Sequence, residues 1–477
     1  MLNDIFNILI PQICLGGFII LLLFLSMFIS PRYYKYARLV SLVGIFLTTL
    51  SLSFVQTEPQ YFALSNSIMS DSYTLLFHFL ILGCGFLVAV LNRALVKESL
   101  QNAYTFYSIL LCAIFGAMNV VSANDFLTLF VSVELLSFST YFLISAYKGY
   151  ASKEATFKYL ITSAISSGVF LFGVSYIYGT CGSINLSEIY EIITLNGHSL
   201  VYTISSILVV LGLISKLAIF PFANWVIDVY KGCETSILAF ISTVPKLAIF
   251  GILCRLLVFS IGNSVELPLV IAIISLITAF WANTYAVKEN NVKAILACSS
   301  AANASYMLMA VALVSVYNLS AVIFYLICYV FMNISVFAFL NIYGDKNNMD
   351  VTNFKGYFYK YPILTIFYVF SVLSLAGIPI TSGFVSKIYL LSAIASSGLI
   401  FLPFLIVLVV LMVVALFYYL KIIIPFFNQS NQMDETKNLD MVFSQKFILF
   451  FTATITLLMG VFPEKIIELC RLIAYNI

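Results

Sequence analysis

Four ionisable side chains lie inside long apolar stretches of this sequence, where water cannot solvate them. They are Glu134, in the run VELLSFSTYFL, and the three lysines Lys216, Lys246 and Lys387. A charge at the centre of a membrane helix costs about 2.5–3.5 kcal/mol, and such residues usually mark ion or proton paths. A buried lysine can take up and release a proton, because burial and a nearby carboxylate push the pKa of its ammonium in opposite directions. The four residues therefore predict a proton or ion path, with a structural ion pair between helices as the alternative.

Two of the lysines stand beside predicted helix breaks. Pro221 follows Lys216 in SKLAIFPFANW, and Gly377 and Pro379 precede Lys387 in SLAGIPITSGFVSKIYL. Proline removes a backbone donor and clashes with the preceding turn, so each of these helices should divide into two half-helices. Unwound backbone at membrane depth is tolerated only inside protein or beside a water-filled cavity. Ordinary proline kinks would explain the breaks but not the lysines beside them.

The composition of the whole chain is typical of a membrane protein. Of its 477 residues 62% are hydrophobic and 9% are charged, whereas soluble domains carry about 25% charged residues. A span needs about 20 apolar residues, so the sequence predicts an all-α membrane protein with about fourteen transmembrane helices. The spans are expected at about 9–30, 36–55, 71–92, 104–121, 123–146, 157–179, 200–222, 235–257, 267–286, 294–315, 318–342, 361–396, 400–424 and 445–463.

Spans 7 and 12, which carry the two breaks, are five spans apart. A pair of interrupted spans at corresponding positions indicates an internal repeat of the kind found in transporters. We predict two inverted five-helix repeats, spans 4–8 and spans 9–13. The corresponding regions are a three-helix segment at 1–103, the repeats at 104–258 and 259–424, and an inner loop with a final helix at 425–477.

The positive charges predict how the chain is oriented in the membrane. When alternate loops are assigned to opposite sides, 17 of the 23 lysines and arginines fall on the inner side and three, including Arg255, on the outer side. Inner loops carry an excess of lysine and arginine, so both termini are predicted on the outer, periplasmic side. The remaining three are Lys216, Lys246 and Lys387, which lie within spans.

Cysteine and histidine give no sign of a metal or haem site. The nine cysteines form no C-x-x-C pair, and the two histidines, His78 and His198, are far apart in the sequence. These patterns favour small core residues over a disulfide framework or a metal site.

Five stretches of the sequence together resemble one known family. VELLSFSTYFL is similar to its glutamate motif in span 5, KLAIFPFANWVIDVYKG to its broken span 7, CSSAANASY to its serine motif in span 10 and LAGIPITSGFVSKIYL to its broken span 12. The family is that of the antiporter-like subunits shared by respiratory complex I (NADH:quinone oxidoreductase) and multisubunit cation/proton antiporters. EATFKYLITSAISSGVFLFGVSYIYGTCGSINL is close to the pattern of its bacterial subunit-N branch, the counterpart of mitochondrial subunit 2. The resemblance runs nearly from end to end.

The resemblance implies a membrane-arm subunit of a translocase, which moves protons as redox chemistry elsewhere in the complex drives it. It implies no cofactor in this chain, because NADH, flavin, iron–sulfur clusters and quinone belong to the whole complex. The implied partners are the other membrane-arm and peripheral subunits of complex I and the lipid bilayer, in the inner (plasma) membrane of a bacterium. Nucleic acid is not expected as a partner, because the sequence has no basic arm.

Roles are implied for five residues that match the family's motifs. Glu134 and Lys216 would form a pair between spans 5 and 7. Lys246 would be the central relay and Lys387 the lysine toward the outer half-channel. Lys158, near the start of span 6, would modulate the pair, although a lysine near the interface can reach water without any function.

Polar residues around these lysines are predicted to complete the path. Ser299, Asn303 and Tyr306 recur at i, i+4 and i+7, which places them on one face of the span-10 helix. Such a stripe can also serve only to pack one membrane helix on another. The predicted lining of the path comprises Ser299, Ser300, Asn303, Tyr306, Ser382 and Ser386.

The sequence departs from the family pattern at the central relay. Ala223 and Asn303 stand where the family commonly has histidine, and WVIDVYKGCE lacks the usual proline before Asp228. Asparagine can orient water but cannot carry a proton near neutral pH. Two alternatives to a pumping complex I subunit therefore stay open: a subunit of a cation/proton antiporter, and a non-pumping structural subunit. A stand-alone solute transporter is less favoured, because the sequence shows no charged site beyond a proton path.

Overall fold

A computed structural model describes residues 2–28, 34–55, 61–92, 103–146, 149–197, 199–261, 266–344, 349–428 and 442–476. In this part of the chain the only sheet is a two-stranded hairpin, and helices make up the rest of the regular structure. The prediction of an all-α membrane protein is confirmed. Parts of the predicted inner loops, at 29–33, 93–102, 147–148, 345–348 and 429–441, and His198 lie outside the described residues.

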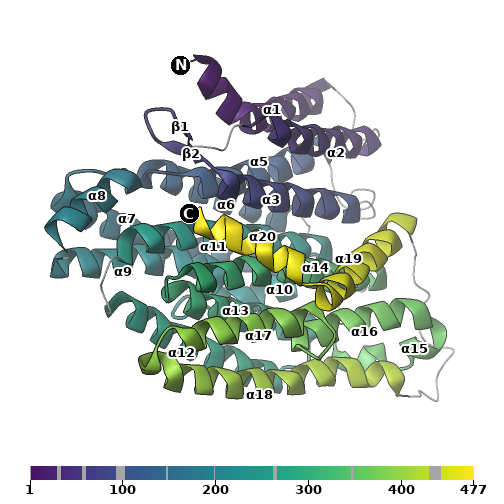
Figure 1. Cartoon of the computed structure of the whole chain (residues 1–477). Coiled ribbons are helices and arrows are strands. Elements are labelled where there is room, and N and C mark those ends of the chain that lie inside the picture. Colours follow the sequence, from purple (N-terminus) through teal and green to yellow (C-terminus); the bar gives the residue numbers. More distant parts are fainter. Residues whose placement is uncertain are drawn as a thin grey trace. The chain divides into compact units, whose positions relative to one another are not determined.

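The chain forms two compact units. Unit 1 consists of Met1–Leu217, Val244–Ile271 and Ile473–Ile477, and unit 2 consists of Ala218–Thr243 and Ala272–Leu472. The elements up to the first break are α1 (Leu2–Phe28), α2 (Tyr34–Ser51), η2 (Leu52–Phe54), β1 (Tyr61–Ala63), β2 (Ile68–Ser70), α3 (Ser72–Leu91), α5 (Ala103–Ser122), α6 (Phe126–Ser145), α7 (Tyr150–Cys181), α8 (Leu186–Asn196), α9 (Leu200–Ile214) and η3 (Ser215–Leu217). Within unit 1, α1, α2 and α3 pack in sequence order (Figure 1).

Beyond the first break, the long helix α11 begins in unit 2 and ends in unit 1. The elements are α10 (Trp225–Gly232), α11 (Thr235–Ile261), α12 (Glu266–Lys288), α13 (Val292–Ala312), α14 (Val316–Tyr343), η4 (Val351–Phe354), α15 (Tyr357–Lys360), α16 (Pro362–Ala376), α17 (Ser382–Ser396), η5 (Leu399–Phe401), α18 (Leu402–Phe427), α19 (Phe443–Val461) and α20 (Glu464–Tyr475). Within unit 2, α16, α17 and α18 pack against one another (Figure 1).

Each predicted span has a counterpart among these helices. Thirteen of the described helices are long and apolar enough to cross a membrane. The predicted span 12 is divided into two shorter apolar helices, α16 and α17, on either side of the Gly377–Pro379 stretch. Span 7 stops at Leu217, and a helix resumes at Trp225. Both predicted breaks are therefore present, while the division into inverted repeats stays a prediction.

Short polar side chains fix where the helices begin. Asp71 caps α3 by accepting a hydrogen bond from the backbone N–H of Thr74, whose hydroxyl accepts one in return from the N–H of Asp71. Asn291 caps α13 and Thr381 caps α17, each with a side-chain oxygen that accepts from a backbone N–H of the first turn. Each cap satisfies a backbone donor that the helix itself leaves free.

Loops that were predicted on the same side of the membrane contact one another within each unit. In unit 1, the side-chain amides of Asn124 and Asn185 donate to the carbonyl of Asn66 at 2.9 and 3.1 Å, which joins two predicted outer loops to the outer end of predicted span 5. In unit 2, Lys231 pairs with the Glu289 carboxylate at 2.9 Å, and Lys421 donates to the Glu289 carbonyl at 2.7 Å. These three residues belong to predicted inner segments. Loops assigned to one side therefore lie together within each unit.

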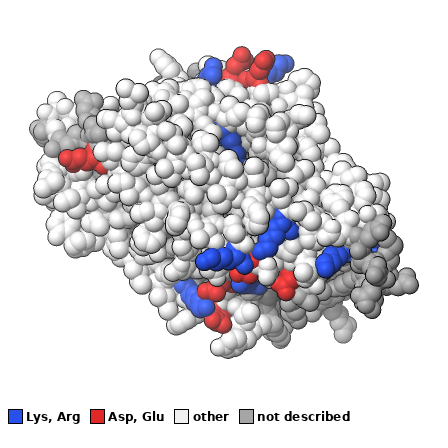
Figure 2. All heavy atoms as spheres, turned by 90° about the horizontal axis from the view of Figure 1, so that it is seen from below, with Lys and Arg blue, Asp and Glu red and all other residues white. Residues whose placement is uncertain are grey.

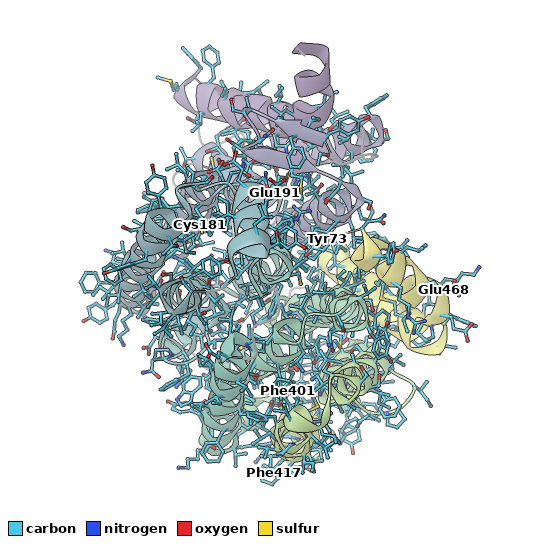
Figure 3. All side chains as sticks on the ribbon, turned by 60° about the vertical axis from the view of Figure 1, so that its left-hand side comes forward. Tyr73, Cys181, Glu191, Phe401, Phe417 and Glu468 are labelled. Carbon is cyan, nitrogen blue, oxygen red and sulfur yellow. The ribbon has the colours of Figure 1, made fainter. Side chains whose placement is uncertain are left out.

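Uncharged side chains dominate the surface. Figure 2 shows one face on which the charged atoms form a few clusters and most of the rest is uncharged. Along α18, the exposed side chains are large and apolar, and Phe417 at the rim of unit 2 is 60% exposed (Figure 3). Such a helix face suits contact with lipid tails or with another membrane subunit.

Candidate functional site

The predicted pair between spans 5 and 7 is present in unit 1. The Lys216 ammonium lies 3.8 Å from Oε1 of Glu134. This is well below the Debye length of about 10 Å, beyond which salt screens exposed charges from each other. The Lys216 side chain is buried, whereas that of Glu134 keeps 20% of its surface exposed. The predicted proximity of these two residues is confirmed. The distance is too long for a direct hydrogen bond, so the pair is close but loose.

Two serines of α7 hold the pair in place. Ser167 donates a hydrogen bond to Oε1 of Glu134, and the Lys216 ammonium donates one to Oγ of Ser163. The two serines are four residues apart, so they share one face of α7 and present their hydroxyls side by side. Sequence analysis did not single them out, although their spacing in YLITSAISSGVF was visible.

Close helix packing positions Lys216 against α7. A Cβ atom added to Gly212 would lie 2.5 Å from Cβ of Phe170, so only glycine lets α9 approach α7 this closely. Beside the pair is a cavity of about 10 Å³, lined by Glu134, Lys216 and Ser167 among others. That volume is at the lower limit of about 10–15 Å³ that one water molecule needs.

Lys158 forms an ion pair with a different carboxylate. Its ammonium makes an ion pair of 2.8 Å with Glu154, one helical turn earlier on α7, and both side chains are about half exposed. This position agrees with the alternative that Lys158 only extends toward the membrane interface. Its modulating role stays a prediction.

The other two membrane lysines are also buried. Lys246, 4% exposed, follows Pro245 inside α11. Lys387, on α17 in unit 2, donates hydrogen bonds to the carbonyls of Leu375 at 2.8 Å and Ala376 at 2.9 Å. These carbonyls form the last turn of α16, the negative end of that half-helix. Lys387 therefore caps the first half of its own broken span.

The hydroxyls predicted beside Lys387 have other partners. Ser386 donates to the carbonyl of Gly383 at 3.1 Å, and Ser382 shares a hydrogen bond of 3.4 Å with Ser374 across the break. The polar groups that the structure places against the Lys387 ammonium are backbone carbonyls instead. A sequence pattern could not show this, because the carbonyls are exposed only by the way the helix breaks.

The predicted polar stripe of α13 is fully buried in unit 2. The amide of Asn303 donates to Ser299 at 3.4 Å, in agreement with their placement on one face, and Tyr306 accepts a hydrogen bond of 3.3 Å from Asn283. Four tyrosines that sequence analysis did not single out surround the stripe. They are Tyr230, Tyr325, Tyr329 and Tyr419.

Arg255, which was counted among the charges of the outer side, is buried within a helix. It lies inside α11, is fully buried, and pairs with the Asp71 carboxylate at 2.6 Å. It also donates to the carbonyl of Val121 at 2.9 Å and covers the ring of Tyr73, a buried residue labelled in Figure 3. The helix extends past the apolar run because this ion pair satisfies the guanidinium inside unit 1.

Lys293 is one of the 17 positive charges that were counted on the inner side as loop residues, but it lies within a helix. Asn291 caps α13, so the helix begins before Lys293 and carries it inward. The side chain is 3% exposed, and its ammonium donates to the carbonyl of Cys233 at 2.8 Å. A count of charges between apolar runs could not show that this lysine is buried.

Comparison with known proteins assigns the chain to a family. The family model described as "NADH:quinone oxidoreductase/Mrp antiporter, TM" matches residues 123–414. The chain belongs to this family. NADH-quinone oxidoreductase subunit N of Anoxybacillus flavithermus, one relative in the family, is 33% identical over 96% of this chain and 94% of its own length.

Solved structures of family members share the fold. A chain of respiratory complex I from Thermus thermophilus, solved with bound aureothin, superposes with a TM-score of 0.83 at 25% identity, covering 96% of this chain and 98% of that one. A chain of the Mrp complex from Dietzia has a TM-score of 0.82 at 20% identity and covers 100% of this chain and 98% of its own. The second likeness concerns the fold alone.

Proposed function

We propose that this chain is the subunit-N component of a bacterial NADH:quinone oxidoreductase, and that it moves protons through its buried lysines. The first part is supported by membership of the family and by relatives named subunit N, which match this chain over nearly their whole length. The observation that carries the second part is the loose buried pair of Glu134 and Lys216 beside the break in span 7.

The geometry of this pair suits a switch. Two unit charges about 4 Å apart attract by about 4 kcal/mol at the effective dielectric of about 20 found in proteins. The Glu134 charge therefore helps to decide whether Lys216 keeps its proton. Because no direct hydrogen bond joins the two groups and Ser163 already holds the ammonium, a small shift of Glu134 would change this attraction without rebuilding the packing.

The later steps of the path use Lys246 and Lys387. Lys246 would receive the proton as the central relay, and Lys387 would pass it toward the outer side. The carbonyls of Leu375 and Ala376 support this assignment, because they stabilise the Lys387 side chain after it has taken up a proton. The redox cofactors would be held by other subunits.

Replacing Glu134 with glutamine tests the proposal. The purified complex would be reconstituted into vesicles, and the number of protons translocated per NADH oxidised would be measured. We expect Glu134→Gln to lower this ratio while NADH oxidation continues. Glu154→Gln, which removes a half-exposed carboxylate from the neighbouring helix α7, is the matched control and should leave the ratio unchanged. An unchanged ratio in Glu134→Gln would remove the basis for pumping and favour a structural subunit.

A subunit of a cation/proton antiporter is the second candidate, because the family model covers both classes and the Dietzia Mrp chain shares the fold. The subunits that purify with this chain decide between the two. Redox subunits support the proposal, whereas antiporter subunits alone contradict it.

We also propose that both termini face the periplasm, as the excess of positive charge on one set of loops indicates. A reporter fused after Lys446 should then behave as cytoplasmic. A periplasmic signal at that site would reverse the orientation.

A further inference from the structure

Among the residues that the structure describes, the buried interior of unit 2 holds neither of the acidic or imidazole side chains that usually carry protons inside proteins. Both histidines of the chain precede residue 218, so unit 2 has none. Among the buried side chains that the structure describes in unit 2, there is no carboxylate, and the charged ones are Lys293 and Lys387. Any proton that crosses this unit between lysines must therefore use hydroxyl groups or water.

Three hydroxyl groups from three different helices form a continuous chain in unit 2. The hydroxyl of Tyr230, on α10, donates to Oγ of Ser300, on α13, at 3.1 Å. Ser300 in turn shares a hydrogen bond of 3.0 Å with the hydroxyl of Tyr329, on α14. Ser300 accepts from Tyr230, and in its hydrogen bond with Tyr329 either hydroxyl can be the donor. All three side chains are buried.

Asn303 organises a second group of hydroxyls one turn along α13. Its side-chain oxygen accepts a hydrogen bond of 2.8 Å from Tyr325, and its amide donates to Ser299 and to Tyr419, each at 3.4 Å. Ser299 and Tyr419 are also hydrogen-bonded to each other. An amide cannot pass on a proton near neutral pH, so Asn303 fixes the positions of these hydroxyls and does not itself relay.

We propose that Tyr230, Ser300 and Tyr329 form a hydroxyl relay that conducts protons inside unit 2, with Asn303 as a positioning residue for the adjoining Ser299–Tyr419 pair. This inference rests on the proposed pumping function. It assigns the step to neutral hydroxyls, which donate and accept at the same time, and not to a histidine.

The relay balances without leaving a charge behind. A proton that arrives forms a new O–H bond on Tyr230, whose original proton passes to Ser300. Ser300 then gives its own proton to Tyr329, and Tyr329 releases its original proton to the next acceptor. One O–H bond breaks for each that forms. The three hydroxyls are left pointing the other way and must rotate before the next proton.

Packing alone does not account for the tyrosines. A phenylalanine would fill nearly the same volume without a hydroxyl that must find a partner in the core. Tyr368 of unit 2 gives a direct contrast. It is fully buried and stacks on Phe339, but its hydroxyl has no hydrogen-bond partner among the described residues. Buried tyrosines of this unit thus divide into those joined in a chain and those that only pack.

The test removes single hydroxyls from the assembled complex. Tyr329→Phe and Ser300→Ala break the chain, Ser300→Thr keeps its hydroxyl, and Tyr368→Phe makes the same chemical change as Tyr329→Phe outside the chain. Protons translocated per NADH oxidised are measured in reconstituted vesicles, and NADH oxidation reports on assembly. We expect Tyr329→Phe and Ser300→Ala to lower the ratio by as much as Glu134→Gln does. Ser300→Thr should restore most of what Ser300→Ala loses, and Tyr368→Phe should keep the ratio.

Two outcomes would overturn the relay in different ways. If Glu134→Gln lowers the ratio but Tyr329→Phe and Ser300→Ala do not, protons bypass these hydroxyls and the proposed function stands without the relay. If Glu134→Gln has no effect, pumping through this chain is wrong, and the relay falls with it. Ser300→Ala makes the test possible even if Tyr329→Phe fails to assemble, because it removes a single oxygen atom.

Discussion

The two broken spans each hold a buried lysine, but they hold it with different kinds of partner. Lys216 contacts side chains of neighbouring helices, namely Glu134 of α6 and Ser163 of α7. Lys387 contacts backbone carbonyls of the half-helix that precedes it in its own span. One lysine is therefore tied to groups that can rotate or change charge, and the other to groups that can do neither.

This difference separates a site that can be switched from a site that is fixed. A carboxylate can be neutralised or displaced, so the stability of the Lys216 ammonium depends on the state of its neighbours. Backbone carbonyls keep the same partial charge as long as the half-helix stays folded. The first break is thus suited to receive a signal, and the second to provide a constant stopping point for a proton.

Both breaks contain a residue other than glycine in the left-handed backbone region. They are Ala218, at φ 59°, and Ile380, at φ 76°. For a β-branched residue such as Ile380 this conformation is a genuine outlier, and strain of this kind costs about 1–3 kcal/mol. The surroundings of the second break must therefore hold the backbone more firmly than those of the first.

The largest expected effect comes from filling the space between the two halves of span 12. A Cβ atom added to Gly383 would lie 1.7 Å from the carbonyl oxygen of Ser374, a backbone atom that cannot move aside. We expect Gly383→Ala to lower the free energy of unfolding by about 3 kcal/mol and to disturb the carbonyls that hold Lys387. The midpoint of thermal unfolding of the purified complex measures the loss.

Gly168→Ala in α7 is the matched control, since nothing lies within 4 Å of the added Cβ atom. It makes the same substitution in a membrane helix and should leave the midpoint unchanged. Equal midpoints for both variants would show that the second break is not rigid, and the contrast with the first break would be lost.

A double-mutant cycle tests whether the first break really depends on its charged neighbour. Lys216→Met alone leaves the Glu134 carboxylate without its cationic partner, and a buried charge without a partner is costly. Adding Glu134→Gln removes that charge. We therefore expect a coupling free energy of about 2 kcal/mol between the two substitutions, measured from the unfolding midpoints of both single variants and the double variant. Strictly additive losses would contradict a pair that works as one unit.

Sequence alone predicted the fold of this chain better than the partners of its buried groups. Apolar runs and proline positions predicted all fourteen spans and both breaks, because membrane helices must be about 20 residues long and must satisfy their own backbone. The family resemblance implied the pair of Glu134 and Lys216, and the high cost of an unpaired charge in a membrane supports it.

The failures concern contacts that depend on three-dimensional packing. Arg255 and Lys293 were counted only as charges of the outer and inner side, although Asp71 and a backbone carbonyl, respectively, satisfy them inside the protein. The tyrosines around α13 were overlooked, because four tyrosines on three other helices form no continuous pattern along the sequence. In an apolar chain, the sequence shows where the charged residues are but does not show which groups they contact.

The smallest expected effect comes from the pair of Lys231 and Glu289, which lies outside the spans. Its contribution to stability can be compared with that of the pair of Lys216 and Glu134 inside the membrane. Partial burial raises the pKa of the Glu289 carboxyl, but hydrogen bonds from Lys231 and from the N–H groups of Asn290 and Asn291 outweigh this and hold the pKa below its ordinary value. Because the pKa is lowered in the folded protein, the pair stabilises the fold above about pH 4.3, the pKa of an unfolded glutamate. This contribution is lost as the pH falls through the lowered pKa.

Glu289→Gln should therefore cost about 0.5 kcal/mol at pH 7, as is usual for a pair in contact with solvent. Unfolding midpoints of this variant and of the unmodified complex, measured from pH 7 downward, should draw together in acid, because both then lack the charge. A difference that widens in acid would mean that Glu289 is stabilised in its protonated form. A loss at pH 7 as large as the coupling between Glu134 and Lys216 would show that burial does not strengthen a lysine–glutamate pair in this protein. The switch proposed at the first break would then lose its physical basis.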